Sequence, residues 1–198
     1  MSLFKKFFGS SESDEDKDAH QSPFNPEAII PADELFTLNF KKNGGKFLYC
    51  ENLEEVKEQF EHILEENDWF ESEALCFEPK LFSLLEENKL SFTKPANPKF
   101  LLASCENLIA DEGSVLFSSN QIKQNKPNEL PVNIVILATT SQILASKSDG
   151  LREIKKKYET NYPTNITTMK YFEKAKDEDF LQYGSVAKNF YLLLLEDL

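Results

Sequence analysis

The stretch KFLYCENLEEVKEQFEHILEEN, residues 46–67, places a short apolar segment directly before an amphipathic helical pattern. Lys46–Cys50 has the length and composition of a buried strand. Asn52, with Glu55 three residues later, is typical of a helix start. Apolar residues then recur with a period of 3.6, at Leu53, Val56, Phe60, Ile63 and Leu64. A strand followed at once by a helix is the basic unit of an α/β fold.

The same alternation continues on both sides of this unit. Residues 33–43 carry apolar side chains at helical spacing and end at two glycines, which is typical of a helix that stops there. Strands are expected at residues 74–77 and 90–93, with a helix at 79–88 between them. This order predicts a mostly parallel central sheet that is flanked by helices.

The second half of the chain contains mainly short apolar segments, which predict strands at residues 100–104, 108–110, 115–118, 134–138, 166–169 and 190–195. One helix is expected to start at Ser146, with Leu151, Ile154 and Tyr158 on its inward face. The chain has 198 residues, which suits one domain. We therefore predict a single α/β domain.

The N-terminal segment differs in composition from the rest. Residues 1–8 form a short basic and aromatic tip, and residues 9–25 are rich in Ser, Glu, Asp and Lys. Such a segment buries too little apolar surface to offset its ordering entropy, so residues 1–25 are predicted to be a disordered acidic arm. The domain then spans residues 26–198. Contact of the tip with an anionic membrane is the less favoured alternative to a frayed terminus.

Charge and cysteine usage exclude several classes of protein. The net charge is −12, which opposes binding to nucleic-acid phosphates. Three widely spaced cysteines and two histidines predict free thiols in the cytoplasm and no metal site. The sequence contains neither a dinucleotide-binding glycine fingerprint nor a P-loop, so no cofactor is expected. No segment approaches the roughly 20 apolar residues that span a bilayer.

One polar stretch interrupts the apolar segments of the middle region. Residues 111–114 read DEGS, and residues 118–121 read SSNQ after the next strand. Glycine and small hydroxyl residues at strand ends let backbone amides approach an anion, and a carboxylate there can act as a base or nucleophile. A hairpin turn and a polar loop are the alternative explanation, and spacing alone favours it.

Residues 105–113, CENLIADEG, together with the later Leu130-Pro131 before the strand expected at 134–138, resemble the LUD family. This is the lactate-utilization domain, once called a domain of unknown function. Members carry an alanine-acid-Thr-Gly-Thr segment, which is matched here by Ala110, Glu112, Gly113 and Ser114. The resemblance covers roughly residues 31–198. The family's later Gly-Pro-Ser segment has no counterpart here, where residues 168–172 read TMKYF.

The resemblance implies a NagB/RpiA/CoA-transferase-like fold and a place in lactate metabolism, because some members are subunits of an iron–sulfur system that oxidises lactate. We therefore expect an accessory protein of lactate or related organic-acid metabolism that binds a small anionic metabolite. Glu112 is the catalytic candidate, and Lys126 and Lys170 are alternatives to Lys123 as the basic residue. The expected ligand-binding residues are Gly113, Ser114, Ser118, Asn120 and Lys123.

Two further functions remain open at this point. The chain could be a non-catalytic interaction protein that kept the fold and lost the site, with a protein partner. It could also be a CoA-transferase-like enzyme that uses Glu112 as its nucleophile. Whether the protein is an enzyme, and in which oligomeric state it exists, are left open by the sequence.

Overall fold

The computed structural model describes residues 30–170 and 188–197. The predicted arm, residues 1–25, and its aromatic tip lie outside the described residues, and so does the start of the predicted domain at residue 26. Within the described part of the chain, no helix is long and apolar enough to cross a membrane.

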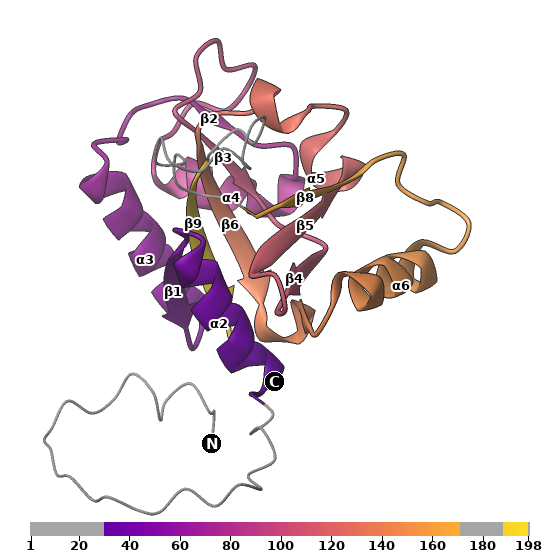
Figure 1. Ribbon diagram of the computed structural model, residues 1–198. Helices are drawn as coiled ribbons and strands as arrows, with labels where there is room; N and C mark the ends of the chain where they lie inside the picture. Colours follow the sequence, from indigo (N-terminus) through magenta and orange to yellow (C-terminus); the bar gives the residue numbers. More distant parts are fainter. Residues whose placement is uncertain (1–29, 171–187, 198) are drawn as a thin grey trace, which may run out of the picture.

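The described residues form two sheets. The larger one has five strands in the order β1-β9-β6-β3-β2, and every neighbouring pair is parallel (Figure 1). This confirms the predicted α/β fold with a mostly parallel central sheet flanked by helices. Its central strands are almost continuously apolar, as expected for strands that are covered on both faces. The five strands are β1 (Lys46–Cys50), β2 (Ala74–Leu75), β3 (Phe100–Ala103), β6 (Asn133–Thr139) and β9 (Asn189–Leu195).

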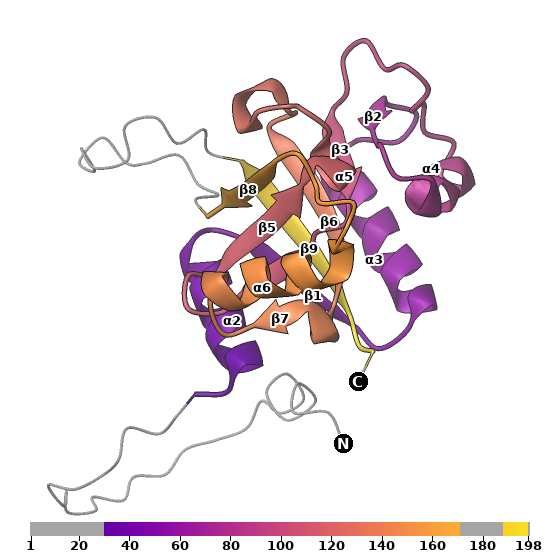
Figure 2. The same ribbon diagram turned by 90° about the vertical axis from the view of Figure 1, so that its right-hand side faces the viewer.

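The smaller sheet has four strands in the order β7-β4-β5-β8 (Figure 2). The β4–β5 and β5–β8 pairs are antiparallel, whereas β4 and β7 are parallel. The sequence predicted three of these strands but not that they leave the central sheet to form a second one. The strands are β4 (Asn107–Ile109), β5 (Ser114–Ser118), β7 (Ile143–Leu144) and β8 (Ile166–Met169).

Five α-helices of the described residues surround the sheets. They are α2 (Ala32–Lys42), α3 (Leu53–Glu66), α4 (Phe82–Glu87), α5 (Ser119–Ile122) and α6 (Lys147–Tyr158). The predicted caps are present, because Asn52 accepts a hydrogen bond from the Glu55 amide at 3.0 Å and Ser146 accepts one from the Asp149 amide at 3.3 Å. Short 3₁₀ turns occupy Pro79–Leu81, Pro127–Glu129 and Thr140–Gln142.

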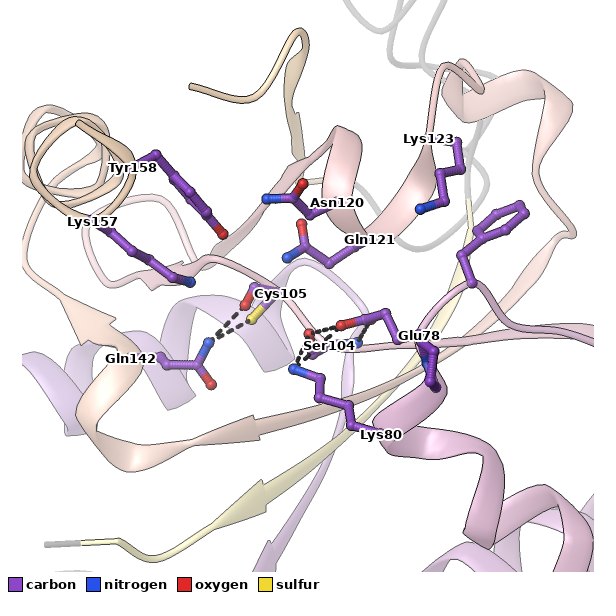
Figure 3. Close-up of a pocket in the computed structure, with 12 residues that line it drawn as sticks. Glu78, Lys80, Ser104, Cys105, Asn120, Gln121, Lys123, Gln142, Lys157 and Tyr158 are labelled. Carbon is purple, nitrogen blue, oxygen red and sulfur yellow. Dashed lines mark hydrogen bonds and ion pairs between the residues drawn. The ribbon is translucent and has the colours of Figure 1, made fainter. Parts of the chain in front are cut away.

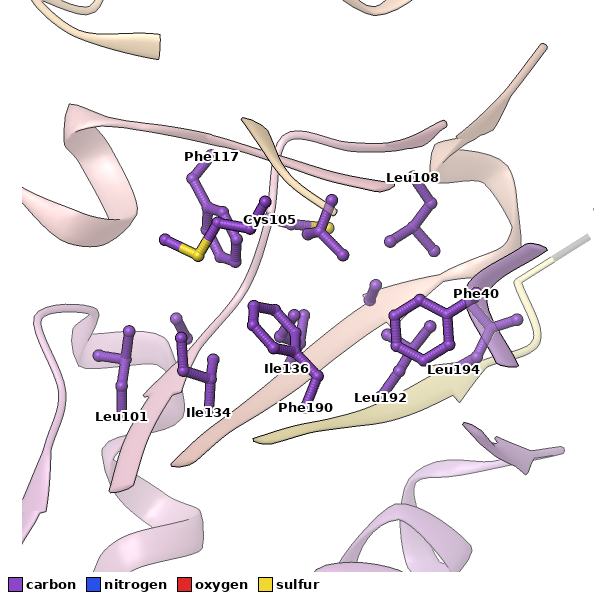
Figure 4. Packing of buried hydrophobic residues seen from close by; sticks show 14 of the residues in the cluster. Phe40, Leu101, Cys105, Leu108, Phe117, Ile134, Ile136, Phe190, Leu192 and Leu194 are labelled. Carbon is purple, nitrogen blue, oxygen red and sulfur yellow. The ribbon is translucent and has the colours of Figure 1, made fainter. Parts of the chain in front are cut away.

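Alternating side chains of the central sheet pack against different layers. One set, which includes Leu101, Ile136 and Leu192, meets α2 and the smaller sheet (Figure 4). The opposite set, which includes Phe100 and Leu193, packs with α3 and α4. The smaller sheet in turn carries α6 on its outer face through the contacts of Ile154 with Ile109 and Leu116. The protein is therefore layered as helices, central sheet, second sheet with α2, and α6.

Three local predictions are wrong. Residues 90–93 form no strand; Ser91 makes only an isolated bridge to Glu73. Leu53 is 59% exposed because it begins α3, before that helix reaches the sheet. Leu151 is 38% exposed because Gly150, rather than Leu151, faces the smaller sheet together with Ile154.

Candidate functional site

A pocket of about 520 Å³ opens beyond the carboxyl ends of three parallel strands (Figure 3). Phe77 and Glu78 follow β2, Ser104 and Cys105 follow β3, and Gln142 follows β6. The carboxyl ends of parallel strands meet at one edge of a sheet, which is where open α/β sheets bind ligands. The fold itself therefore places these residues around one cavity.

Two helix ends complete the wall of the pocket. Asn120, Gln121 and Lys123 come from α5 and the residue that ends it, whereas Lys157 and Tyr158 come from the last turn of α6. These groups belong to the smaller sheet and its helices. The pocket thus lies where the two sheets diverge, with the central sheet on one side and α5 and α6 on the other.

At the end of β3, the buried Glu78 carboxylate holds Ser104. One oxygen, Oε2, accepts a hydrogen bond from the Ser104 amide at 2.6 Å, and Oε1 accepts one from the Ser104 hydroxyl at 2.6 Å. The Lys80 ammonium lies 3.2 Å from Oε1 and donates to the Ser104 hydroxyl at 3.0 Å. The positive charge of Lys80 is therefore largely balanced by Glu78.

A second carboxylate, that of Glu106, lies buried behind the α5 and α6 wall, with a side chain only 1% exposed. Its Oε1 accepts hydrogen bonds from the Ser118 hydroxyl at 2.6 Å and the Gln121 amide at 2.9 Å. Its Oε2 accepts one from the Lys157 ammonium at 2.9 Å, and the Tyr158 hydroxyl lies 2.9 and 3.1 Å from the two oxygens.

These contacts keep Glu106 ionised. Burial alone raises the pKa of the Glu106 carboxyl, but the hydrogen bonds from Ser118, Lys157, Gln121 and Tyr158 outweigh it and hold that pKa below the ordinary value. The partner ammonium responds in the opposite sense: burial lowers the pKa of Lys157, but its bonds to Glu106 and Tyr158 raise it above the ordinary value. Both groups of the pair are therefore charged at neutral pH.

The pocket wall also contains the Gln142 amide, the Cys105 thiol and the Lys123 ammonium. The Gln142 amide donates to the carbonyl oxygens of Cys105 at 2.7 Å and Glu106 at 3.1 Å, so it fixes the backbone after β3. Burial raises the pKa of the Cys105 thiol, which disfavours its nucleophilic thiolate form. Lys123 is exposed, and no carboxylate of the described residues lies within ion-pair distance of it.

The ligand-binding residues that the sequence predicted do not lie together in the structure. Asn120 and Lys123 line the pocket, and Ser118 lies directly behind it on Glu106. Glu112 and Gly113 instead lie in the turn before β5, and Ser114 begins that strand, at the opposite end from Ser118. The two ends are about 13 Å apart at roughly 3.3 Å per residue.

The turn at Glu112 packs against α2. The Glu112 carboxylate accepts a hydrogen bond from the Ser114 hydroxyl at 3.0 Å, and its carbonyl accepts one from the Asn43 amide at 2.8 Å. Gly113 has a positive φ of 60° and lies against the backbone of Asn39. These contacts are those of a hairpin turn, and a catalytic role for Glu112 stays a prediction. The alternative lysines, Lys126 and Lys170, do not line the pocket.

Sequence reasoning missed the two carboxylates that organise the site. Glu106 is the one charged residue in the mostly apolar run of residues 100–110, FLLASCENLIA. This was the available signal, since an ionised side chain inside an apolar run needs buried partners. Glu78 had no comparable signal, because it stands between a short strand and a proline. Across residues 30–170 and 188–197, no group of three His, Cys, Asp or Glu side chains could hold a metal ion.

Comparison with known proteins gives one informative likeness. No family model matches the sequence, and no curated protein matches it. The crystal structure of a DUF162 family protein from Deinococcus radiodurans superimposes with a TM-score of 0.56 at 10% sequence identity, and the match covers 85% of this chain and 99% of that one. DUF162 is the former name of the LUD family. The chain thus shares the overall fold of a DUF162 family protein.

Proposed function

We propose that this protein binds a small organic anion in the pocket beyond β2, β3 and β6, as an accessory protein of lactate-type organic-acid metabolism. The observation that supports the proposal is the position of the pocket. It lies at the sheet edge where α/β proteins bind ligands. Of the three lysines that line it, two are paired with Glu78 and Glu106, which leaves one uncompensated positive charge in the described pocket wall. In a protein with a net charge of −12, such a positive charge favours an anionic ligand.

The polar groups of the wall suit an organic acid better than an apolar ligand. Asn120 offers a side-chain amide, and Phe77 and Pro79 add apolar surface for a carbon skeleton. A volume of about 520 Å³ falls within the usual range of small-molecule pockets and leaves room for an acid larger than lactate. Acids with longer or branched side chains are therefore included in the proposal.

The metabolic assignment rests on two likenesses that agree. The segments at residues 105–116 and 130–131 resemble the LUD family, and the fold is similar to that of a DUF162 family protein. Some LUD proteins belong to an iron–sulfur system that oxidises lactate to pyruvate. We carry over to this chain only the class of metabolite, a hydroxy or keto acid, and not the oxidation itself.

A thermal-shift screen tests the proposal. The purified full-length chain is screened against hydroxy and keto acids, acyl-CoAs, nucleotides and folates, because a ligand that binds only the folded state raises Tm. We expect a concentration-dependent rise with at least one organic acid. A rise with nucleotides or folates alone would contradict the proposal. No rise with any compound would favour the interaction-protein alternative.

A further inference from the structure

The backbone of Lys123 has an uncommon conformation for a lysine. Its φ of 55° and ψ of −133° match the first central residue of a type II′ turn, a position dominated by glycine. A side chain with a Cβ is strained there, at a cost on the order of 1–3 kcal/mol. The Lys123 amide still donates to the Ser119 carbonyl at 3.0 Å, so the turn is held by α5.

Positive φ alone does not mark a site, because five other non-glycine residues of the described ranges share it: Asp68, Glu71, Lys89, Lys94 and Glu159. None of these five lines the pocket, whereas Lys123 does. Figure 3 shows the Lys123 amine directed into the cavity, toward Gln121. Among the residues that the structure describes, only Lys123 combines a strained backbone, a place in the pocket wall and an amine directed into the cavity.

The charge states of the three pocket lysines also single out Lys123. Lys80 is paired with Glu78, and Lys157 is paired with Glu106. Lys123 has no ion pair within the described ranges, so its charge is available to a ligand. The pocket therefore presents one uncompensated positive charge and two that are already balanced.

We infer that Lys123 is the residue that binds the carboxylate of the ligand, and that its strained turn holds the ammonium in the cavity. This rests on the proposed function and specifies its chemistry. One uncompensated ammonium matches the single charge of a carboxylate, whereas a phosphate group carries about −1.5 to −2 at pH 7. No arginine lines the pocket to supply the bidentate contacts that favour phosphate.

Three variants of the full-length chain test the inference by calorimetric titration with pyruvate, phenylpyruvate and inorganic phosphate. Lys123→Met removes the ammonium and keeps a Cβ in the strained turn. Lys123→Gly removes the ammonium and relieves the strain. Lys89→Gly is the matched control, because it makes the same exchange at a φ of 56° away from the pocket.

We expect the unaltered protein to bind a keto acid more tightly than phosphate, and both Lys123 variants to raise the Kd for that acid at least tenfold. Lys89→Gly should leave that Kd unchanged. Lys123→Gly should melt about 2–4 °C above Lys123→Met, because glycine tolerates the turn.

The failures of the two proposals are distinguishable. If the unaltered protein binds neither keto acid and no organic acid raises its Tm in the thermal-shift screen, the proposed function fails and the inference fails with it. If it binds a keto acid and both Lys123 variants bind that acid equally well, only the role of Lys123 is overturned. Phosphate binding as tight as that of the keto acids overturns the assignment to a carboxylate.

Discussion

The ammonium of Lys157 lies 2.9 Å from the buried Oε2 atom of Glu106, which ties the last turn of α6 to the residue before β4. Under α6 the buried apolar cluster is small: Ile154 packs with Ile109 and Leu116, and the partly buried Tyr158 and Ile166 lie beside them. The position of Lys157 and Tyr158 in the pocket wall therefore depends largely on one carboxylate.

Replacing Glu106 with Gln should lower the free energy of unfolding by about 2 kcal/mol, because the donors around it lose a charged acceptor. Urea unfolding measures this difference. Glu153→Gln serves as the control, since its pair with Lys156 is exposed and 3.9 Å long and should contribute less than about 1 kcal/mol. Equal effects of the two variants would contradict the structural role of Glu106.

The effect of Glu106→Gln should depend on pH. In the folded protein the hydrogen bonds outweigh burial and hold the pKa of the Glu106 carboxyl below its ordinary 4.5. A carboxyl with a lowered pKa stabilises the fold above its unfolded value and loses this contribution as pH falls through the folded value. The difference in unfolding free energy between the two proteins should thus be largest above pH 4.5 and shrink below it. A difference that grows on acidification would contradict the lowered pKa.

Gly113→Ala should destabilise the protein by at least about 2 kcal/mol. A Cβ at this position would lie 2.3 Å from the Asn39 carbonyl carbon and 2.5 Å from the Phe40 nitrogen, and φ is +60°. Thermal unfolding of the variant checks this. Unchanged stability would mean that the turn does not pack against α2 as described.

Glu112→Gln should leave keto-acid binding unchanged, because Glu112 lies at the opposite end of β5 from the residues near the pocket. Stability should also change little, since the Ser114 hydroxyl keeps an amide oxygen as its acceptor. Calorimetric titration of the variant with pyruvate and phenylpyruvate measures binding. A folded variant that no longer binds would restore Glu112 as a site residue, as the sequence suggested.

Periodicity and capping residues carried much of the fold prediction. The strands at Lys46–Cys50 and Ile166–Met169 and the cap at Asn52 appear where the sequence placed them, because each depends on local side-chain pattern. The second sheet could not be foreseen in this way. Which strands pair is decided by long-range contacts, and the short apolar segments of the middle region fit either sheet.

The sequence predicted only part of the site, because long-range packing also decides which residues meet there. Asn120 was recognised because it follows a strand, and Lys123 as a basic residue suggested by the LUD resemblance; both line the pocket. Glu78 and Lys157 lie far from them in sequence, and the packing of the smaller sheet against the central sheet brings them near. The match to the LUD pattern drew attention to Glu112, which the antiparallel turn directs to the other end of β5.

The proposed ligand of the pocket beyond β2, β3 and β6 is a carboxylate. Titration of the ¹⁵N-labelled protein with phenylpyruvate, followed by amide chemical shifts, tests this proposal most directly. We expect saturable shifts at Ser104, Cys105, Gln121, Lys123 and Gln142, with little change at Glu112 and Gly113. Saturable shifts confined to the turn at Glu112 and Gly113, with none around Lys123, would contradict it.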